Sequence, residues 1–349
     1  MARGGDPEPL RARQDAGLDW TLVEAIAKRH RVEGLVHKAM CDAGLPSRFA
    51  DAARSIGKQN LMHAAEAKRL HDQFDAKGLV HLFLKGATLD MVAWKSLAIK
   101  RSIDIDLLVE PHDYVDACGL LLEAGYRCVP PYPGDVPVPQ IAAYARRNKD
   151  SVWRNRRRGI TVELHQRLTA NPVLLPGISA RSPRQIVGIA PGIDLPTLAR
   201  DELFAYLCVH GALTAWSRLK WAADLAAFIG AEQDLAGLYR QAVQMAPPRA
   251  VAQALLVNSA LFGTPLGPEL EATLRSSRRN RQLERLALQT MLRGGPEKEL
   301  SDQRMGTARL HFSIMFLKSG ARFKIQEGTR QLLRVADQLR RRMKTGAAG

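Results

Sequence analysis

The apolar residues of this chain change their spacing twice, and these changes limit the folds that it can adopt. Over 19–77 they recur every three or four residues, which predicts helices. Over 79–169 short apolar runs and alternating stretches predict strands, and helical spacing returns from Pro196 onward. We therefore expect an α+β fold, in which a small mixed sheet lies between N-terminal and C-terminal helical regions.

The same changes divide the 349 residues into four parts, and this length suits two or three packed units. We expect an N-terminal helical region at 1–77 and a sheet-containing core at 78–170. A helical domain at 171–265 and a basic helical C-terminal region at 266–349 complete the chain. Strands of the core are expected near 79–84, 102–109, 126–129, 151–153 and 160–165, with a proline-rich loop at 130–139.

Two aspartates share one face of the most clearly alternating strand. Asp104 and Asp106 lie two residues apart, so both side chains point to the side opposite Ile105 and Leu107. Carboxylates placed this close repel each other and raise each other's pKa unless a cation lies between them. Hard oxygen ligands favour Mg²⁺ or Mn²⁺ over zinc. The pattern therefore indicates a metal site, although such a pair alone is also typical of a solvated strand edge.

A third acid comes from the segment 160–165. Its apolar residues alternate with Thr161, Glu163 and His165, which puts Glu163 on the face away from the core. A strand of this kind is what should lie beside the strand of the two aspartates. Three acids on neighbouring strands suit a two-metal site for displacement at phosphorus. A single glutamate on a strand is otherwise usually just solvated, so this interpretation depends on all three acids converging.

A phosphate-binding turn is expected before these strands. Lys85 and Gly86 follow a short apolar run and precede a predicted helix, so the glycine lets the backbone approach an anion near a helix N-terminus. Arg101 comes directly before the strand of the aspartates and can bind phosphate oxygens through two donors. The alternatives are a surface lysine and an arginine that pairs with a nearby acid.

These segments carry a family resemblance. Leu84-Lys85-Gly86 followed by the run 101–109 resembles the polymerase-beta-type nucleotidyltransferase superfamily, and within it the bacterial uncharacterised nucleotidyltransferase family. The segment 162–165 resembles that group's strand with the third acid and the following histidine. His210-Gly211 and the stretch 216–224 resemble its helical signature. The turn here is Lys-Gly, the insert before the aspartates is longer than usual, and the third acid is Glu where Asp is commoner.

The resemblance implies a magnesium-dependent transferase that moves a nucleoside monophosphate from an NTP, such as ATP, to a hydroxyl group. Asp104, Asp106 and Glu163 would be catalytic and bind Mg²⁺ or Mn²⁺, and the acceptor would be a peptide or protein, an RNA or a small molecule. Residues predicted to bind the nucleotide are Lys85, Gly86, Arg101 and Lys220. Residues with a possible accessory role, or only a structural one, are His165, His210 and Asp224.

The chain carries a formal charge of +16, which attracts polyanions but is also typical of an Arg-rich composition. A cluster of basic residues flanks the strand of Glu163 and either guides an anionic acceptor or is a solvated hairpin. Its members are Arg146, Arg147, Lys149, Arg154, Arg156, Arg157 and Arg158. The basic C-terminal helix is either solvated or a surface for RNA, anionic lipid or a partner protein.

No apolar run is long enough to span a bilayer, the start of the chain lacks a secretory pattern, and the four cysteines are scattered. These features predict a cytoplasmic protein without a transmembrane segment. Two other functions stay open at this point. One is kinase-like phosphoryl transfer to a peptide on the same fold, and the other is RNA binding without catalysis.

Overall fold

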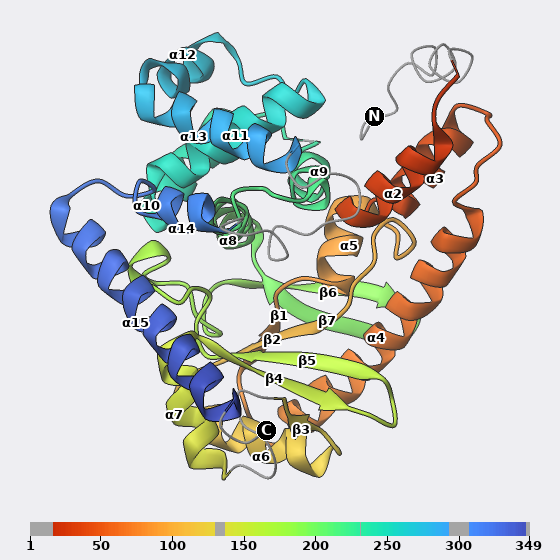
Figure 1. The fold of residues 1–349 in the computed structure, drawn as a ribbon. Coiled ribbons are helices and arrows are strands. Elements are labelled where there is room, and N and C mark those ends of the chain that lie inside the picture. The colour runs from red at the N-terminus through yellow and green to blue at the C-terminus, as the bar shows by residue number, and fades with distance from the viewer. Residues whose placement is uncertain (1–16, 130–136, 231, 293–306, 347–349) are drawn as a thin grey trace.

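The computed structural model of the protein describes residues 17–129, 137–230, 232–292 and 307–346. A five-stranded sheet occupies one half of the molecule, and helices gather above and beside it (Figure 1). The predicted α+β fold, with a small mixed sheet between helical regions, is confirmed. Every helix in these ranges is too short or too polar to cross a membrane.

The sheet has the strand order β1-β2-β5-β4-β3. Only β2 and β5 run parallel, and the other neighbours are antiparallel. The hairpin of β4 and β5 was predicted from the sequence, and the basic residues of 156–158 form its turn. The strands are β1 (His81–Phe83), β2 (Ile105–Val109), β3 (Arg127–Cys128), β4 (Asp150–Asn155) and β5 (Ile160–His165).

One face of this sheet packs against helices from the N-terminal region and the core. Ile105, Leu107 and Val162 are buried there, as the alternation of their segments predicts. Side chains from three helices cover them, among them Leu70, Leu121 and others. The helices on this face are α4 (Ala50–Ala76), α6 (Tyr114–Glu123) and α7 (Val138–Asn148).

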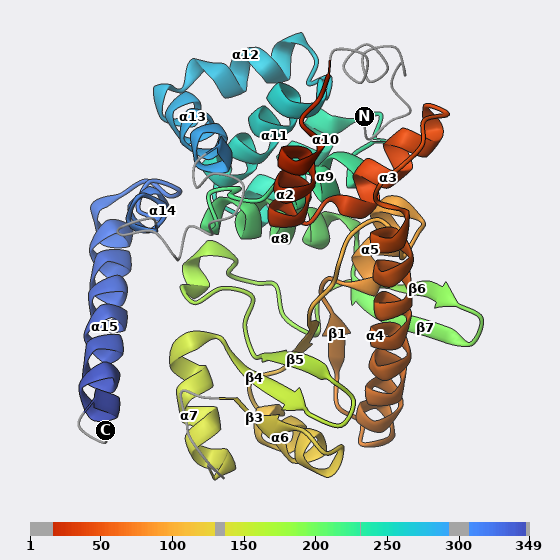
Figure 2. The ribbon, with the colours of Figure 1, turned by 45° about the vertical axis from the view of Figure 1, so that its right-hand side comes forward.

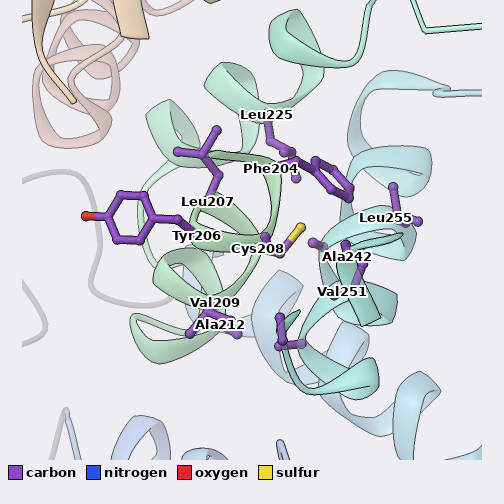
Figure 3. Packing of buried hydrophobic residues seen from close by; sticks show 14 of the residues in the cluster. Phe204, Tyr206, Leu207, Cys208, Val209, Ala212, Leu225, Ala242, Val251 and Leu255 are labelled. Carbon is purple, nitrogen blue, oxygen red and sulfur yellow. The ribbon is translucent and has the colours of Figure 1, made fainter. Parts of the chain in front are cut away.

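The opposite face meets the C-terminal helices along β1 and β2. Leu82 and Leu108 belong to a second hydrophobic cluster that extends through the helical bundle. Figure 3 shows the centre of this cluster, where Phe204, Leu225 and Leu255 pack together. The helices of the bundle are α8 (Arg200–Leu213), α9 (Leu219–Phe228), α10 (Leu235–Met245), α11 (Pro248–Phe262), α12 (Pro268–Ser276), α13 (Arg278–Leu292) and α14 (Ala308–Ile314).

The remaining α-helices are α2, α3, α5 and α15, of which α15 lies at one edge of the molecule. In both views α15 stands on the side opposite α4, with its C-terminal end away from the bundle (Figures 1 and 2). The short helix α5 follows β1 and contacts α9, so it joins the sheet to the bundle. The bounds are α2 (Trp20–His30), α3 (Glu33–Asp42), α5 (Ala87–Trp94) and α15 (Ala321–Gly346).

Two elements differ from the sequence predictions. The part predicted as a helical domain contains an antiparallel hairpin of β6 (Arg184–Ala190) and β7 (Ile193–Leu198). Strand β7 packs on α4 and β1, and β6 packs on α5, so the alternating apolar residues of this segment belong to the core beside the sheet and not to a helix. Helix α7 begins inside the loop predicted at 130–139, since Pro139 is compatible with the first helical turn. The part of that loop at 130–136 lies outside the described residues.

Candidate active site

The parallel pairing of β2 and β5 brings acids from distant segments together. Asp106 lies directly beside Glu163 in the register of the two strands. His165 is two residues further along β5, so its side chain lies on the same face as Glu163. The acids are adjacent because both strands alternate in phase, with their apolar residues on the α4 side.

The contacts among these side chains are short. Asp106 is 3% exposed, and its Oδ1 lies 3.0 Å from Lys85 Nζ and 3.2 Å from His165 Nε2. The same His165 nitrogen is 3.5 Å from Glu163 Oε2. One ligand atom from each of Asp106, Glu163 and His165 lies within 4.8 Å of the others. We call these three residues, with Asp104 and Lys85, the acidic centre.

Neighbouring charges set the ionisation of the inner acids. Burial opposes ionisation of Asp106, but Lys85 and His165 outweigh it and hold its pKa well below the usual range. The hydrogen bond from His165 lowers the pKa of Glu163 as well. Burial and Lys149 act against a charged His165, yet Asp106 and Glu163 raise its pKa above the ordinary value. The structure therefore favours two ionised carboxylates beside positive charge.

Asp104 behaves differently from the two inner acids. It lies just before β2, is half-buried, and is not part of the compact group of ligand atoms found among the described residues. Burial raises its pKa to about 6, and the charges of Asp106 and Glu163 act in the same direction. The carboxyl group of Asp104 thus interacts electrostatically with Asp106 and Glu163, as expected for side chains on one face of the sheet.

Lys85 and Gly86 form the turn between β1 and α5, as predicted. Gly86 has φ 67° and ψ −133°, a conformation that favours glycine. Lys85 points at Asp106, and its pKa lies well above the usual value because this pairing outweighs burial. In this structure Lys85 neutralises an acid of the centre, so a phosphate would share this lysine with Asp106.

Helices α8 and α9 contribute further polar groups. Tyr206 was not singled out from the sequence, and Figure 3 shows its hydroxyl pointing away from the surrounding cluster. Burial raises the pKa of Tyr206, and the nearby positive charge of Lys85 offsets part of this rise. Because Lys85 contacts Asp106, Tyr206 lies beside the acidic centre. His210 contacts the rings of Tyr206 and Trp221, with centroids 5.8 and 5.6 Å apart. Its buried Nε2 has no hydrogen-bond partner among the described residues.

Burial also changes the charge of groups on these helices. The pKa of His210 lies well below its usual value because burial and Lys85 both disfavour the imidazolium. Burial lowers the pKa of Lys220 to about 7, and the charges of Lys100 and Arg31 add to this effect. The positive charge of Lys220 offsets part of the rise in the pKa of Asp104. Lys220 is therefore close enough to interact electrostatically with the acidic centre.

The sequence of the chain settles its family. The profile of a family described as "Uncharacterised nucleotidyltransferase" matches residues 16–263. The chain belongs to this family. A search of curated proteins gave no match. Among solved structures, an antigenic nucleotidyltransferase-like protein from Paracoccidioides brasiliensis is similar at 13% identity, covering 61% of this chain and 92% of that one, with a TM-score of 0.34.

A second buried cluster in this member of the family contains Asp224, one of the predicted accessory residues. Lys100 Nζ lies 2.7 Å from Asp224 Oδ2 and 3.2 Å from Asp90 Oδ1. Trp94 Nε1 donates to Asp224 over 2.9 Å. The Asn60 amide nitrogen donates to the Lys100 carbonyl, and its oxygen accepts from the Ser102 amide. We call Asn60, Asp90, Trp94, Lys100 and Asp224 the closed network.

The closed network holds the long insert between Gly86 and the aspartates in position. The insert runs from α5 back to β2, and α4, α5 and α9 hold it through Asn60, Asp90 and Asp224. Arg101, predicted to contact phosphate, donates to Gln59 Oε1 over 2.8 Å. Asp224 and Arg101 therefore hold this segment in the structure, and the segment leads directly into the strand of the acids.

The basic residues of the β4–β5 hairpin border a hollow of about 880 Å³. Arg154 lies opposite Thr161 in the register, so it shares the sheet face of Glu163. Arg158 pairs with Glu66 at 3.1 Å, whereas Arg154, Arg156 and Arg157 have no carboxylate partner among the described residues. Residues around the hollow include Glu123, Arg127, Arg154, Arg156, Arg157 and Arg158.

Proposed function

We propose that this protein transfers a nucleoside monophosphate from an NTP to a hydroxyl group, with Asp104, Asp106 and Glu163 as the catalytic acids. The observation that supports this most is the register of two parallel strands, which sets Asp106 beside Glu163. A protein that only binds polyanions gains nothing from acids at this position. Membership of a nucleotidyltransferase family supports the general reaction, and the arrangement of the acidic centre supports this location for it.

The acidic centre has the chemistry of a divalent cation site. Two carboxylates and an imidazole nitrogen lie within 4.8 Å of one another, and carboxylate oxygens suit Mg²⁺ or Mn²⁺. Asp106 and Glu163 would hold the ion, with Asp104 at its outer side and His165 as a further ligand or as an orienting donor. A bound cation supplies charge for the phosphates and makes a hydroxyl more acidic.

The lysines of the site suit the phosphates of the nucleotide. Lys85 is fixed beside Asp106 and can bridge this acid and a phosphate oxygen. Lys220 is partly buried and has a pKa of about 7, so a triphosphate would stabilise its charged form. Tyr206 and His210 add polar groups on the same side. We propose that these residues and Gly86 orient the NTP, whereas Arg101 acts through the insert.

The acceptor would approach over the open part of the sheet face. Arg154 pairs in the register with Thr161, which comes two residues before Glu163 on β5. Further arginines border the hollow that Arg154 also lines. Guanidinium groups bind phosphates and carboxylates through paired donors. We therefore propose an acceptor that carries such groups close to its reacting hydroxyl, whether it is a peptide, an RNA or a small molecule.

Incubation with each labelled NTP and magnesium, with and without cell extract, tests the proposed reaction. We expect a labelled product whose mass increases by a nucleotide, and no product from Asp106→Asn. A mass increase of a bare phosphate would indicate kinase-like transfer instead. Equal labelling by the wild type and by Asp106→Asn would place the reaction elsewhere in the molecule.

A further inference from the structure

Helix α15 exposes a group of large apolar side chains. Ile325, Leu332, Leu333 and Val335 are 69%, 72%, 66% and 52% exposed. Single exposed apolar residues are ordinary on a protein surface, but a group on one helix marks an interaction surface. The group does not belong to the acidic centre, so another function must account for it.

The exposed residues lie opposite the side by which α15 contacts the protein. At about 100° per residue, Ile325 and Leu332 project in nearly the same direction and Val335 lies next to them. Phe323 and Glu327, which are 4% and 0% exposed, lie on the other side. The helix thus buries Phe323 and Glu327 on one side and exposes the group of large apolar side chains on the opposite side.

The inner side is held by specific polar contacts. Asn171 Nδ2 donates to Glu327 Oε2 over 3.0 Å, and Gln331 Nε2 donates to the His311 carbonyl over 2.9 Å. Arg330 also pairs with Glu327. These contacts fix the first half of α15 at the edge of the molecule, where Figures 1 and 2 show it. The apolar group therefore faces outward in a set direction.

The charge of α15 discriminates between possible partners. Over Ala321–Gly346 the sequence contains eight basic residues and two acidic ones. A second copy would place two strongly positive helices side by side, and like charges at such distances repel. An anionic lipid surface instead attracts each basic residue and accepts apolar side chains at the headgroup boundary. Charge complementarity therefore favours lipid over self-association.

We propose that α15 lies on the surface of an anionic membrane, with Ile325, Leu332 and Val335 inserted at the headgroup boundary. The helix binds in the membrane plane and does not cross it, because its basic residues are spread along its whole length. The acidic centre lies on another part of the molecule, so membrane binding and nucleotide transfer are separable.

Sedimentation of the full-length protein with lipid vesicles tests this proposal. We expect binding to vesicles of phosphatidylcholine with a third of phosphatidylglycerol, and at least tenfold weaker binding to pure phosphatidylcholine. Binding should fall as salt is raised, because charge contributes to it. Equal binding to neutral vesicles, or no binding to anionic ones, would overturn the proposal.

Matched variants distinguish vesicle binding by α15 from nonspecific hydrophobic binding by other surfaces. Ile325→Glu with Leu332→Glu should reduce vesicle binding at least tenfold, whereas Leu332→Phe should retain it. Ile186→Glu is the control, because Ile186 is 64% exposed on β6, away from α15. Circular dichroism and thermal unfolding check that each variant is folded. If the double variant still binds vesicles, or if it instead abolishes a dimer seen by light scattering, α15 is not a lipid-binding helix.

Discussion

The acidic centre and the closed network both bury carboxylates beside lysines, but they differ in access to solvent. In the acidic centre the side chains of Lys85 and Glu163 are 21% and 30% exposed. In the closed network Lys100, Asp90 and Asp224 are 8%, 0% and 5% exposed. A closed pair can only hold the structure together, whereas a partly open one can exchange its partner for a ligand. The same residue types thus serve stability in one place and, we propose, chemistry in the other.

The largest effect is expected from Asp106→Asn. This change removes a negative charge that Lys85 and His165 contact, while the side chain keeps its size. Nucleotide transfer should fall at least about a thousandfold, because several kcal/mol of transition-state stabilisation depend on a charged metal ligand. The initial rate of label transfer measures this. An unfolding midpoint near that of the wild type would show that the loss is chemical.

Lys100→Met tests the closed network, where we expect a loss of stability and not a direct loss of chemistry. The change leaves Asp90 and Asp224 buried without their cation, which should lower the free energy of unfolding by about 3 kcal/mol. Urea denaturation measures the loss. Lys38→Met is the matched control, because its pair with Asp42 is half exposed and should contribute less than about 1 kcal/mol. Similar losses in the two variants would show that the closed network stabilises the fold no more than a surface ion pair does.

The same contrast shows how far the sequence could predict this molecule. Alternation in two segments was sufficient to place Asp106 and Glu163 on one sheet face, because strand periodicity is a local property. It also put His165 on that face. The pairing of Lys100 with Asp224 joins residues far apart in the sequence, and no local pattern indicates which lysine meets which acid.

Tyr206 shows the same limit, whereas the hairpin of β6 and β7 does not. Nearly every side chain in the middle of α8 is buried, so its periodicity does not tell which face meets the sheet. The alternating apolar residues 187, 189, 193 and 195, around a Pro-Gly turn, were a usable signal for the hairpin. The local pattern therefore located strands and acids, while the partners of the buried polar groups required the tertiary structure.

A pH titration of nucleotide binding tests Lys220, which interacts with residues of both the closed network and the acidic centre. Burial lowers its pKa to about 7, so the free protein loses this positive charge as the pH rises from 6.5 to 8.5. If the charged form contacts the triphosphate, nucleotide affinity should weaken by about tenfold over this interval. Fluorescence titration with a labelled nucleotide measures it. Lys220→Met should bind more weakly at pH 6.5 and show a flatter profile, since the titrating group is gone.

The smallest effect is expected at the arginines that border the open sheet face, because each acts on the acceptor and none on the acids themselves. Arg156→Ala should raise the KM for an anionic acceptor about threefold and make it less sensitive to salt, while kcat changes little. Arg54→Ala is the control, because Arg54 is also an exposed arginine but lies on α4, away from the hairpin. A variant in the closed network should instead change stability without changing the salt dependence of KM. If Arg156→Ala and Arg54→Ala behave alike, the acceptor reaches the acidic centre by another side, and the openness of that centre serves only the nucleotide.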